Sequence, residues 1–259
     1  MTNEEYVKAI EMRQSRRTYS SRPLDDATLQ VIRDLVDIVN KNSGLDMRFI
    51  EDATPAFTFF TGKFCMIALC GDDSEKTRIK LGYFAQMIAL ECVYHGLGTC
   101  YVSGTYNENK VLEVLKLPKE TRLYAGLVIG NVKPKLSTKE KFVHKITHKT
   151  NKTYQNMFET CDRKLPPYYV KAMQLVEMAP SGTNARPVHF KYEDGVMSAY
   201  VDEPYSEKSI DFGIAQLHFK IGAESMGVKG EWDINGKFCP KSTKVIKLNT
   251  AYEEVNDEE

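Results

Sequence analysis

The segment APSGTNARP, residues 179–187, indicates more about the fold than any other part of this sequence. It follows an apolar helical pattern, and its two prolines, its glycine and Asn184 are typical of a rigid, irregular loop. Such a loop exposes backbone N–H groups and an amide side chain, so it could cover a flat polar heterocycle. It could equally be a plain connector, and the loop by itself does not separate the two interpretations.

A second informative segment, RQSRR at residues 13–17, lies near the N-terminus. Arg13, Ser15 and Arg17 alternate after a short amphipathic helix, so in an extended segment they project to one side. Two guanidinium groups and a hydroxyl would suit a phosphate, which arginine binds through paired hydrogen bonds. The alternative is a solvated basic helix end that complements the helix dipole. If both segments bind one ligand, the two parts of the chain fold against each other around it.

A third segment, GLGTCYVSG at residues 96–104, is predicted to leave a buried helix, form a strand and turn at Ser103 and Gly104. Glycine at this turn would let a backbone amide approach a ligand closely. An ordinary connection between a helix and a strand is the alternative.

The remaining pattern predicts an α+β fold. Thr2 with the acidic residues after it marks a helix start, and Asp25 and Asp26 cap a helix that runs through residues 29–41. Residues 81–95 are apolar almost all round, which predicts a buried helix at the centre of the molecule. Residues 57–70 and 123–132 are predicted to be strands.

An internal repeat indicates two related halves. Four positions recur 131 residues later: Gly82, Cys92, Gly96 and Tyr101 correspond to Gly213, Ala223, Gly227 and Trp232. The sequence SGLDMR at 43–48 likewise parallels SGTNAR at 181–186. We therefore predict two α+β halves, 1–155 and 156–250, and an acidic, disordered tail at 251–259. Chance resemblance between two α/β segments is the alternative.

The connection between the halves is expected to contain the lysine-rich stretch 133–152 and the sequence CDRKLPPYY at 161–169. The stretch carries seven lysines and one acid, but few aromatic residues are interleaved as nucleic-acid binding would require. A solvated linker that supplies one phosphate contact is the better interpretation.

The overall charge excludes several classes of partner. The chain has 259 residues, with 35 basic and 35 acidic side chains, so no global basic field points to nucleic acid or to a membrane surface. No apolar run approaches the ~20 residues that cross a bilayer, and the N-terminus lacks the apolar core of a signal peptide. We expect a cytoplasmic protein.

Cysteine and histidine spacing does not favour a metal site. None of the six cysteines forms a C-x-x-C pair, so buried, reduced thiols are expected. His144 and His148 have the spacing of helical metal ligands, but no acidic or third ligand lies nearby. A solvated helix face is the better interpretation of this pair.

Together the three segments resemble the FMN-dependent nitroreductase family. RQSRR stands where that family has Arg-x-Ser-x-Arg, and APSGTNARP is similar to its Pro-Ser-x-x-Asn-x-Gln-Pro loop. The run 82–104 resembles the family's central helix and following strand, and 127–132 its later strand, so the likeness covers most of residues 10–230. The first half retains the arginine-serine motif and has a degenerate loop. The second half retains the loop and lacks the arginine-serine motif. The chain thus resembles the fused two-repeat branch, the TM nitroreductase type, in which one chain imitates the homodimer. A monomer with one FMN is implied.

The resemblance also implies a set of cofactor-binding residues. Arg13, Ser15 and Arg17 would hold the phosphate and ribityl chain, with Gln14 near the pyrimidine edge. Ser103 and Gly104 would lie near the reactive N5 edge. The other half would cover the ring with four residues of its loop: Pro180, Ser181, Gly182 and Asn184. The family adds a late basic residue on the phosphate, for which Lys139 and Lys141 both remain open.

Arg186 departs from the family pattern, which has glutamine there. A cation near the pyrimidine would favour the anionic reduced flavin and could raise its potential.

The function implied is that of a flavin oxidoreductase. NADH or NADPH would pass a hydride to flavin N5, and a nitroaromatic, quinone or similar small acceptor would then take the electrons in the same slot. Such ping-pong chemistry needs neither a catalytic side chain nor a metal. The alternatives are a flavin-binding or sensing protein without turnover, and another reaction of this fold such as reductive dehalogenation.

Overall fold

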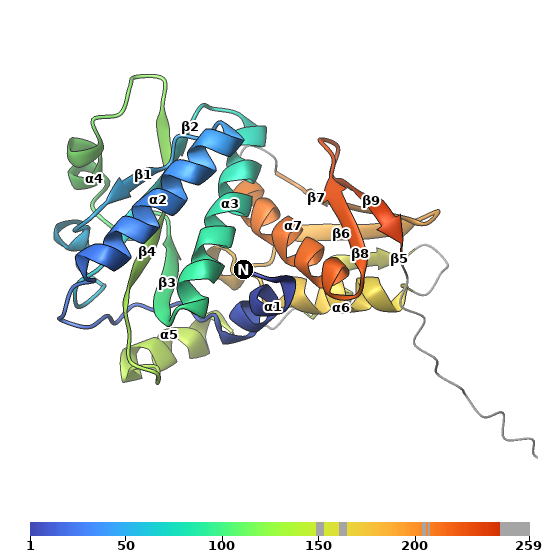
Figure 1. Cartoon of the computed structure of the whole chain (residues 1–259), viewed down its shortest axis with the longest axis horizontal. Helices are drawn as coiled ribbons and strands as arrows, with labels where there is room; N and C mark the ends of the chain where they lie inside the picture. Colours follow the sequence, from blue (N-terminus) through green and yellow to red (C-terminus); the bar gives the residue numbers. More distant parts are fainter. Residues whose placement is uncertain (149–152, 161–164, 204–205, 207, 244–259) are drawn as a thin grey trace, which may run out of the picture.

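Two β-sheets lie on either side of a central pair of helices, α3 (Glu75–Tyr94) and α7 (Lys208–Ser225), in the computed structural model (Figure 1). The structure describes residues 1–148, 153–160, 165–203, 206 and 208–243. Both central helices are buried on most sides, as their apolar composition predicts. Within the described ranges, no helix combines the length and apolar character needed to cross a membrane.

The N-terminal helix α1 (Asn3–Met12) begins at the predicted cap. Thr2 Oγ1 accepts a hydrogen bond from the backbone of Glu5, whose carboxylate accepts one from the backbone of Thr2. The buried side chains of Ala9 and Ile10 pack with apolar residues of α3, α6 (Pro167–Glu177) and α7. This contact fixes the start of the segment 13–17 close to the centre of the molecule.

The first sheet is antiparallel and has the order β1-β2-β4-β3. Its strands are β1 (Arg48–Ile50), β2 (Cys65–Gly71), β4 (Arg122–Asn131) and β3 (Leu97–Val102). Alternate residues of β2 and β4 face opposite sides, as the two-residue period of a strand requires. One face packs on α2 (Asp26–Ser43) and α3, and the other on an aromatic cluster near α4 (Glu108–Leu115) and the short turn η1 (Thr54–Ala56).

The second sheet has the order β5-β6-β7-β9-β8. Its strands are β5 (Phe158–Thr160), β6 (Val188–Glu193), β7 (Val196–Val201), β9 (Lys237–Thr243) and β8 (Val228–Trp232). Helices α6 and α7 pack on it through a core rich in aromatic residues. The first strand, β5, pairs in parallel with β6 and follows the short turn η2 (Tyr154–Met157); the other pairs are antiparallel.

Four strands of each sheet have the same arrangement. The order β1-β2-β4-β3 matches β6-β7-β9-β8, and a central helix connects the second strand to the third along the chain in both cases. Strands β2 and β7 start 131 residues apart, as do β3 and β8. This spacing equals that of the sequence repeat, whose positions therefore occupy equivalent places in the central helices, at their ends and in the strands that follow them.

The two central helices approach each other at a pair of glycines. A Cβ atom added to Gly82 would overlap the carbonyl oxygen of Ile210, and one added to Gly213 would overlap that of Ile79. The contact is reciprocal, because each carbonyl lies three residues before the glycine of its own helix. Backbone therefore packs directly on backbone at the centre of the molecule.

The predicted strand at 57–70 is wrong in its first part, since β2 begins at Cys65. Residues 57–64 form a loop that pairs with the segment 17–20, through Tyr19 N to Thr61 O at 2.8 Å. The aromatic side chains of Phe57, Phe60 and Phe64 pack against each other and Tyr19 instead of alternating across a sheet. Aromatic residues are favoured in strands and in such clusters alike, so composition alone gave the wrong element.

Two smaller predictions also need correction. The lysine-rich stretch is not simply a solvated linker, because residues 138–147 form α5 (Thr138–Thr147), which starts with a capping box at Ser137. Four cysteines are buried as predicted, but Cys239 is exposed on β9. Cys161, residues 149–152 and 161–164 of the predicted connection, and the acidic tail lie outside the described residues.

Candidate functional site

The segment 13–17 is extended and lies against the first sheet. It leaves the end of α1 at Arg13, forms a bridge between Ser15 and Thr99 of β3, and is held by Arg16 N to Thr99 O at 2.9 Å. The predicted alternation holds for Ser15, Arg16 and Arg17, whereas Gln14 lines the same cavity as its neighbours. Arg13, Ser15 and Arg17 line one cavity, whereas Arg16 is buried among residues of the β4–α5 connection.

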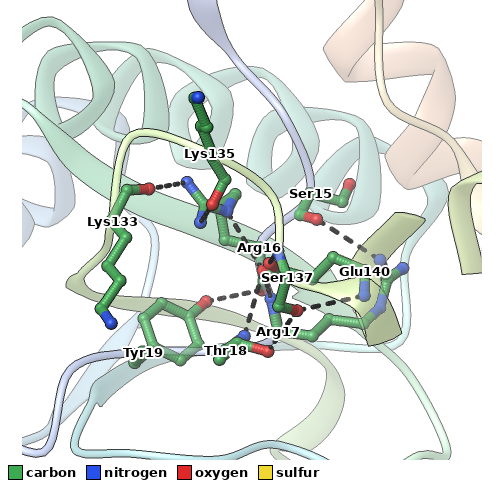
Figure 2. A network of polar contacts seen from close by, with 9 residues as sticks. All are labelled: Ser15, Arg16, Arg17, Thr18, Tyr19, Lys133, Lys135, Ser137 and Glu140. Atoms are coloured by element: carbon green, nitrogen blue, oxygen red, sulfur yellow. Dashed lines mark hydrogen bonds and ion pairs between the residues drawn. The ribbon is translucent and has the colours of Figure 1, made fainter. Parts of the chain in front are cut away.

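Glu140 of α5 binds the segment through several hydrogen bonds (Figure 2). Its carboxylate accepts hydrogen bonds from Arg16 Nε at 3.1 Å and from the backbone N–H groups of Arg17 and Thr18 at 2.8 and 3.1 Å. The backbone of Ser137 donates a fourth, at 2.7 Å. Burial acts to raise the pKa of Glu140, but these hydrogen bonds outweigh it and hold the pKa at about 2. The carboxylate is therefore ionised and balances the buried Arg16.

The loop 179–187 contains a short 3₁₀ turn, η3 (Gly182–Asn184), and three non-glycine residues in the left-handed region. Thr183, Asn184 and Arg186 have φ values of 51°, 61° and 48°. Asparagine tolerates this conformation, but a β-branched threonine adopts it only at a cost in strain. The loop is irregular, as predicted.

Contacts with two other elements hold the loop in place. Gly182 N donates to the carboxylate of Asp211 on α7 at 3.0 Å, and Asn184 Nδ2 donates to Thr147 O at the end of α5 at 3.1 Å. Within the loop, Arg186 N donates to Ser181 Oγ at 2.9 Å. These bonds compensate for the strained backbone and set the loop opposite the segment 13–17.

Two adjoining cavities lie between the segment 13–17 and the loop. Cavity A, of about 310 Å³, is lined by the end of α1, the segment 13–17, one side of α5 and the loop. Cavity B, of about 350 Å³, is bounded by β3 and the turn after it, the loop, Phe59 and Phe60, and the start of α7. Ser15, Arg17 and Ser181 are among the residues that line both. The volumes are at the small end of the range typical of ligand sites, and the two cavities adjoin.

The structure brings together nearly all of the predicted site residues. Eight of them line cavity A: Arg13, Gln14, Ser15, Arg17, Pro180, Ser181, Asn184 and Arg186. Ser103 and Gly182 line cavity B. Gly104 lines neither cavity; it follows Ser103 in the turn after β3, with a left-handed φ of 66°.

Neither candidate for the late basic residue lines the described cavities. The ammonium of Lys139 donates to the carbonyl of Phe59 and lies 3.8 Å from the centre of its ring. Lys141 is exposed on α5. Both lysines are on a helix whose orientation could not be derived from the sequence.

Two buried polar atoms in the cavity walls have no hydrogen-bond partner among the described residues. They are Arg13 Nε and the hydroxyl oxygen of Tyr101. Burial also lowers the pKa of Arg13, which shows how strongly this guanidinium is desolvated. Buried polar groups are normally paired, so these two indicate a site that an oxygen-rich ligand would complete.

Sequence reasoning missed three contributors to the site. Glu140 gave a signal in the pattern Ser137-x-x-Glu140, which predicts a capped helix but not the buried contact with Arg16. The other two are His144 and His148. His144 is exposed, as predicted, and His148 is half-buried, but both also line cavity A, with stacked rings whose centres are 3.7 Å apart. No group of three or more potential metal-binding side chains occurs in the part of the chain that the structure describes.

Comparison with known proteins gives a family and a fold. A family model described as "Putative TM nitroreductase" matches residues 5–223. No curated protein matches the sequence. Among solved structures, a nitroreductase (tm1586) from Thermotoga maritima msb8 superimposes with a TM-score of 0.61 at 18% identity, covering 93% of this chain and 94% of that one.

Other solved structures align over about half of the chain. A nitroreductase family protein from Clostridium difficile 630 has a TM-score of 0.41 at 19% identity, covering 57% of this chain and 92% of its own. The nitroreductase CinD from Lactococcus lactis, solved with 4-nitrophenol, has a TM-score of 0.41 at 15% identity, with coverages of 51% and 92%.

Proposed function

This chain belongs to the TM nitroreductase family, and from that premise we propose that it is an FMN-dependent oxidoreductase. It would use NADH or NADPH to reduce small acceptors such as nitroaromatics or quinones. One observation carries the proposal. The arginine-rich segment 13–17 and the loop 179–187, far apart in sequence, line two adjoining cavities.

The residues of cavity A fit the phosphate end of FMN. Arg13 and Arg17 would hold the phosphate, because guanidinium groups form paired, charge-assisted hydrogen bonds with its oxygens. The buried Arg13 Nε, which has no acceptor among the described residues, supports this assignment. Ser15 would add a hydroxyl, and Glu140 keeps the segment in its extended form. Gln14 is proposed to lie near the pyrimidine.

The residues of cavity B fit the ring end. Phe59, Phe60 and Tyr101 give it an aromatic wall, which favours a flat ligand. The unpaired hydroxyl of Tyr101 offers a polar contact. Ser103 lines the same cavity, and Gly104 follows it in the turn, so the proposal that this turn approaches the reactive edge of the ring remains consistent with the fold.

Bound FMN would supply the hydride and electron transfer of this reaction. The protein's own residues have the tasks of binding, orientation and exclusion of water. The strained loop, tied to Asp211 and Thr147, covers the cavities with little freedom to move. The aromatic wall of cavity B limits the acceptor to flat molecules that fit beside it.

We further propose that the chain is a fused pair of related halves and acts as a monomer with one FMN. The shared strand order and the reciprocal contact of Gly82 and Gly213 support an origin by duplication. Both motifs that line cavity A come from one chain, so the site needs no partner subunit.

Anaerobic titration of the purified protein with NADH and with NADPH tests the proposed function. The expected protein is yellow, and one of the two nucleotides bleaches it; a panel of nitroaromatic and quinone acceptors then restores the colour. A protein that stays colourless and takes up no added FMN would refute the proposal. If the protein binds FMN but neither nucleotide bleaches it, the protein is a flavin-binding protein without turnover.

Cutting the chain near residue 155 tests the shared site. We expect each piece alone to lose FMN and the reassembled pieces to recover it. A single piece that retains FMN would show that the two motifs do not share a ligand.

A further inference from the structure

The stacked pair of His144 and His148 belongs to the wall of cavity A, although no family motif includes it. Both residues are at the end of α5, with ring centres 3.7 Å apart and planes inclined by 12°. The C-terminal end of a helix favours a nearby positive charge. A proton taken up by the pair would therefore be stabilised by the end of α5.

The hydrogen bonds of His148 fix its tautomer. Nδ1 lies 3.0 Å from the carbonyl oxygen of His144, which can only accept, and 3.0 Å from Thr147 Oγ1, which can donate or accept. The contact with the carbonyl is a hydrogen bond only if Nδ1 carries the proton, so we assign this tautomer. In the neutral ring Nε2 then has no proton and cannot donate to an anion. The ring must take up a proton before it can bind an anionic oxygen through Nε2.

The surroundings of His148 disfavour its protonated form. Burial lowers the pKa of His148, and the positive charges of His144, Arg186 and Arg13 lower it further; only the hydrogen bond to His144 O opposes them. The charged groups that line the cavity with the pair are Glu11, Arg13, Arg17, Glu140, Glu177 and Arg186. Glu140 is already balanced by Arg16, and Glu177 accepts a hydrogen bond from Tyr154 N.

Binding of a dianion in cavity A reverses the electrostatic effect on the protonation of His148. A phosphate monoester carries close to two negative charges above its own second pKa of about 6. Its two negative charges would offset those of Arg13 and Arg17, and its own attraction for an imidazolium would then favour a proton on His148.

We propose that His144 and His148 recognise the phosphate monoester of the flavin and take up one proton from solvent when it binds. The pair would thus replace the late basic residue that neither Lys139 nor Lys141 supplies. This inference rests on the proposed function, because it takes FMN as the ligand of cavity A.

The first test measures FMN affinity by quenching of flavin fluorescence between pH 6 and pH 9. We expect the affinity to fall by about tenfold as the pH rises through the range in which the bound imidazolium loses its proton. Riboflavin, which lacks the phosphate, should bind with no such dependence. Calorimetry in two buffers of different ionisation enthalpy, above the phosphate's own pKa, should detect proton uptake with FMN and none with riboflavin.

The variants His144→Gln and His148→Gln keep a polar side chain but cannot become cations. Each should weaken FMN binding at low pH, and the His148 variant should remove the pH dependence. His95→Gln is the matched control, because His95 is exposed at the end of α3 and lines neither cavity. It should behave as the wild type does.

Two results would overturn the inference. One is the same pH dependence in both variants as in the wild type; the other is an equal loss of riboflavin and FMN affinity, which a merely structural role would give.

Failure of the proposed function can be distinguished from failure of this inference. If the protein binds no flavin, titration of the flavin-free protein with inorganic phosphate, followed by proton NMR of the imidazole rings, still tests the pair. A rise in the pKa of His148 with phosphate would support it, and no change would overturn it.

Discussion

Replacing Glu140 by glutamine removes a negative charge from the junction between α5 and the segment 15–18. The carboxylate accepts four hydrogen bonds, and its side chain is 1% exposed. Its pKa is about 2, compared with an ordinary value of 4.5. This difference corresponds to about 3 kcal/mol of folding free energy at neutral pH. The variant also leaves Arg16 buried without its counter-charge, for which about 3–5 kcal/mol is typical.

Because the pKa of Glu140 is lowered in the folded protein, its contribution is complete above about pH 4.5 and is lost as the pH falls toward about 2. Urea unfolding followed by circular dichroism should give a free energy of unfolding about 3 kcal/mol lower for Glu140→Gln at pH 7. The two proteins should converge in stability as the pH falls through this window.

The matched control is Glu5→Gln. Glu5 has the same position in the capping box of α1, but it is only half-buried, and its carboxylate accepts hydrogen bonds from Thr2 N and from the hydroxyl of Tyr94. It should cost much less stability. Our reasoning is refuted if Glu140→Gln unfolds at the same urea concentration as the wild type at pH 7, or if the difference persists undiminished at pH 2.

Three further variants test the packing and the cavities. Gly213→Ala should destabilise the protein by about 1–3 kcal/mol, because the methyl group meets the backbone of Ile79; an unchanged thermal midpoint would contradict this. Arg13→Ala should weaken FMN binding about tenfold or more, since it removes a charge-assisted contact, and should affect riboflavin less. Equal losses for the two flavins would speak against a phosphate contact. Arg186→Gln should lower the midpoint potential of the bound flavin in spectroelectrochemical titration, and an unchanged potential would sink the assigned role.

The fold class could be predicted because local pattern and tertiary packing agree in most elements. Helix α3 is apolar on nearly every side and is buried on most sides, and the caps at Thr2 and Asp25 start helices where the sequence places them. The loop 57–64 could not be predicted in the same way. Its aromatic residues pack around Tyr19, and Gly62 adopts a left-handed conformation against the backbone of Tyr19. Those contacts join residues that are far apart in the sequence, so a pattern read over neighbouring residues does not contain them.

The candidate site was also predictable only where local patterns determine the positions of its residues. Arg13, Ser15 and Arg17 could be predicted because strand alternation is a local rule, and the structure keeps it. The roles of Glu140 and of the histidine pair depend on which way α5 faces. That orientation is set by the contact of Glu140 with Arg16, 124 residues away in the chain. A short-range pattern carries no information about it.

The reciprocal glycine contact between α3 and α7 has a consequence for cooperativity. Each helix supplies the smallest residue where the other supplies a carbonyl, so neither surface is complete alone. A chain in which one sheet has unfolded would leave a backbone-lined groove on the other central helix, with the apolar residues beside it exposed to water. Such a half-folded state is unfavourable, and the two sheets are expected to unfold in a single transition. The segment 13–17 and the loop 179–187 then keep their separation as long as the whole chain is folded. That separation depends on Gly82 and Gly213, whose missing side chains allow the two helices to pack closely.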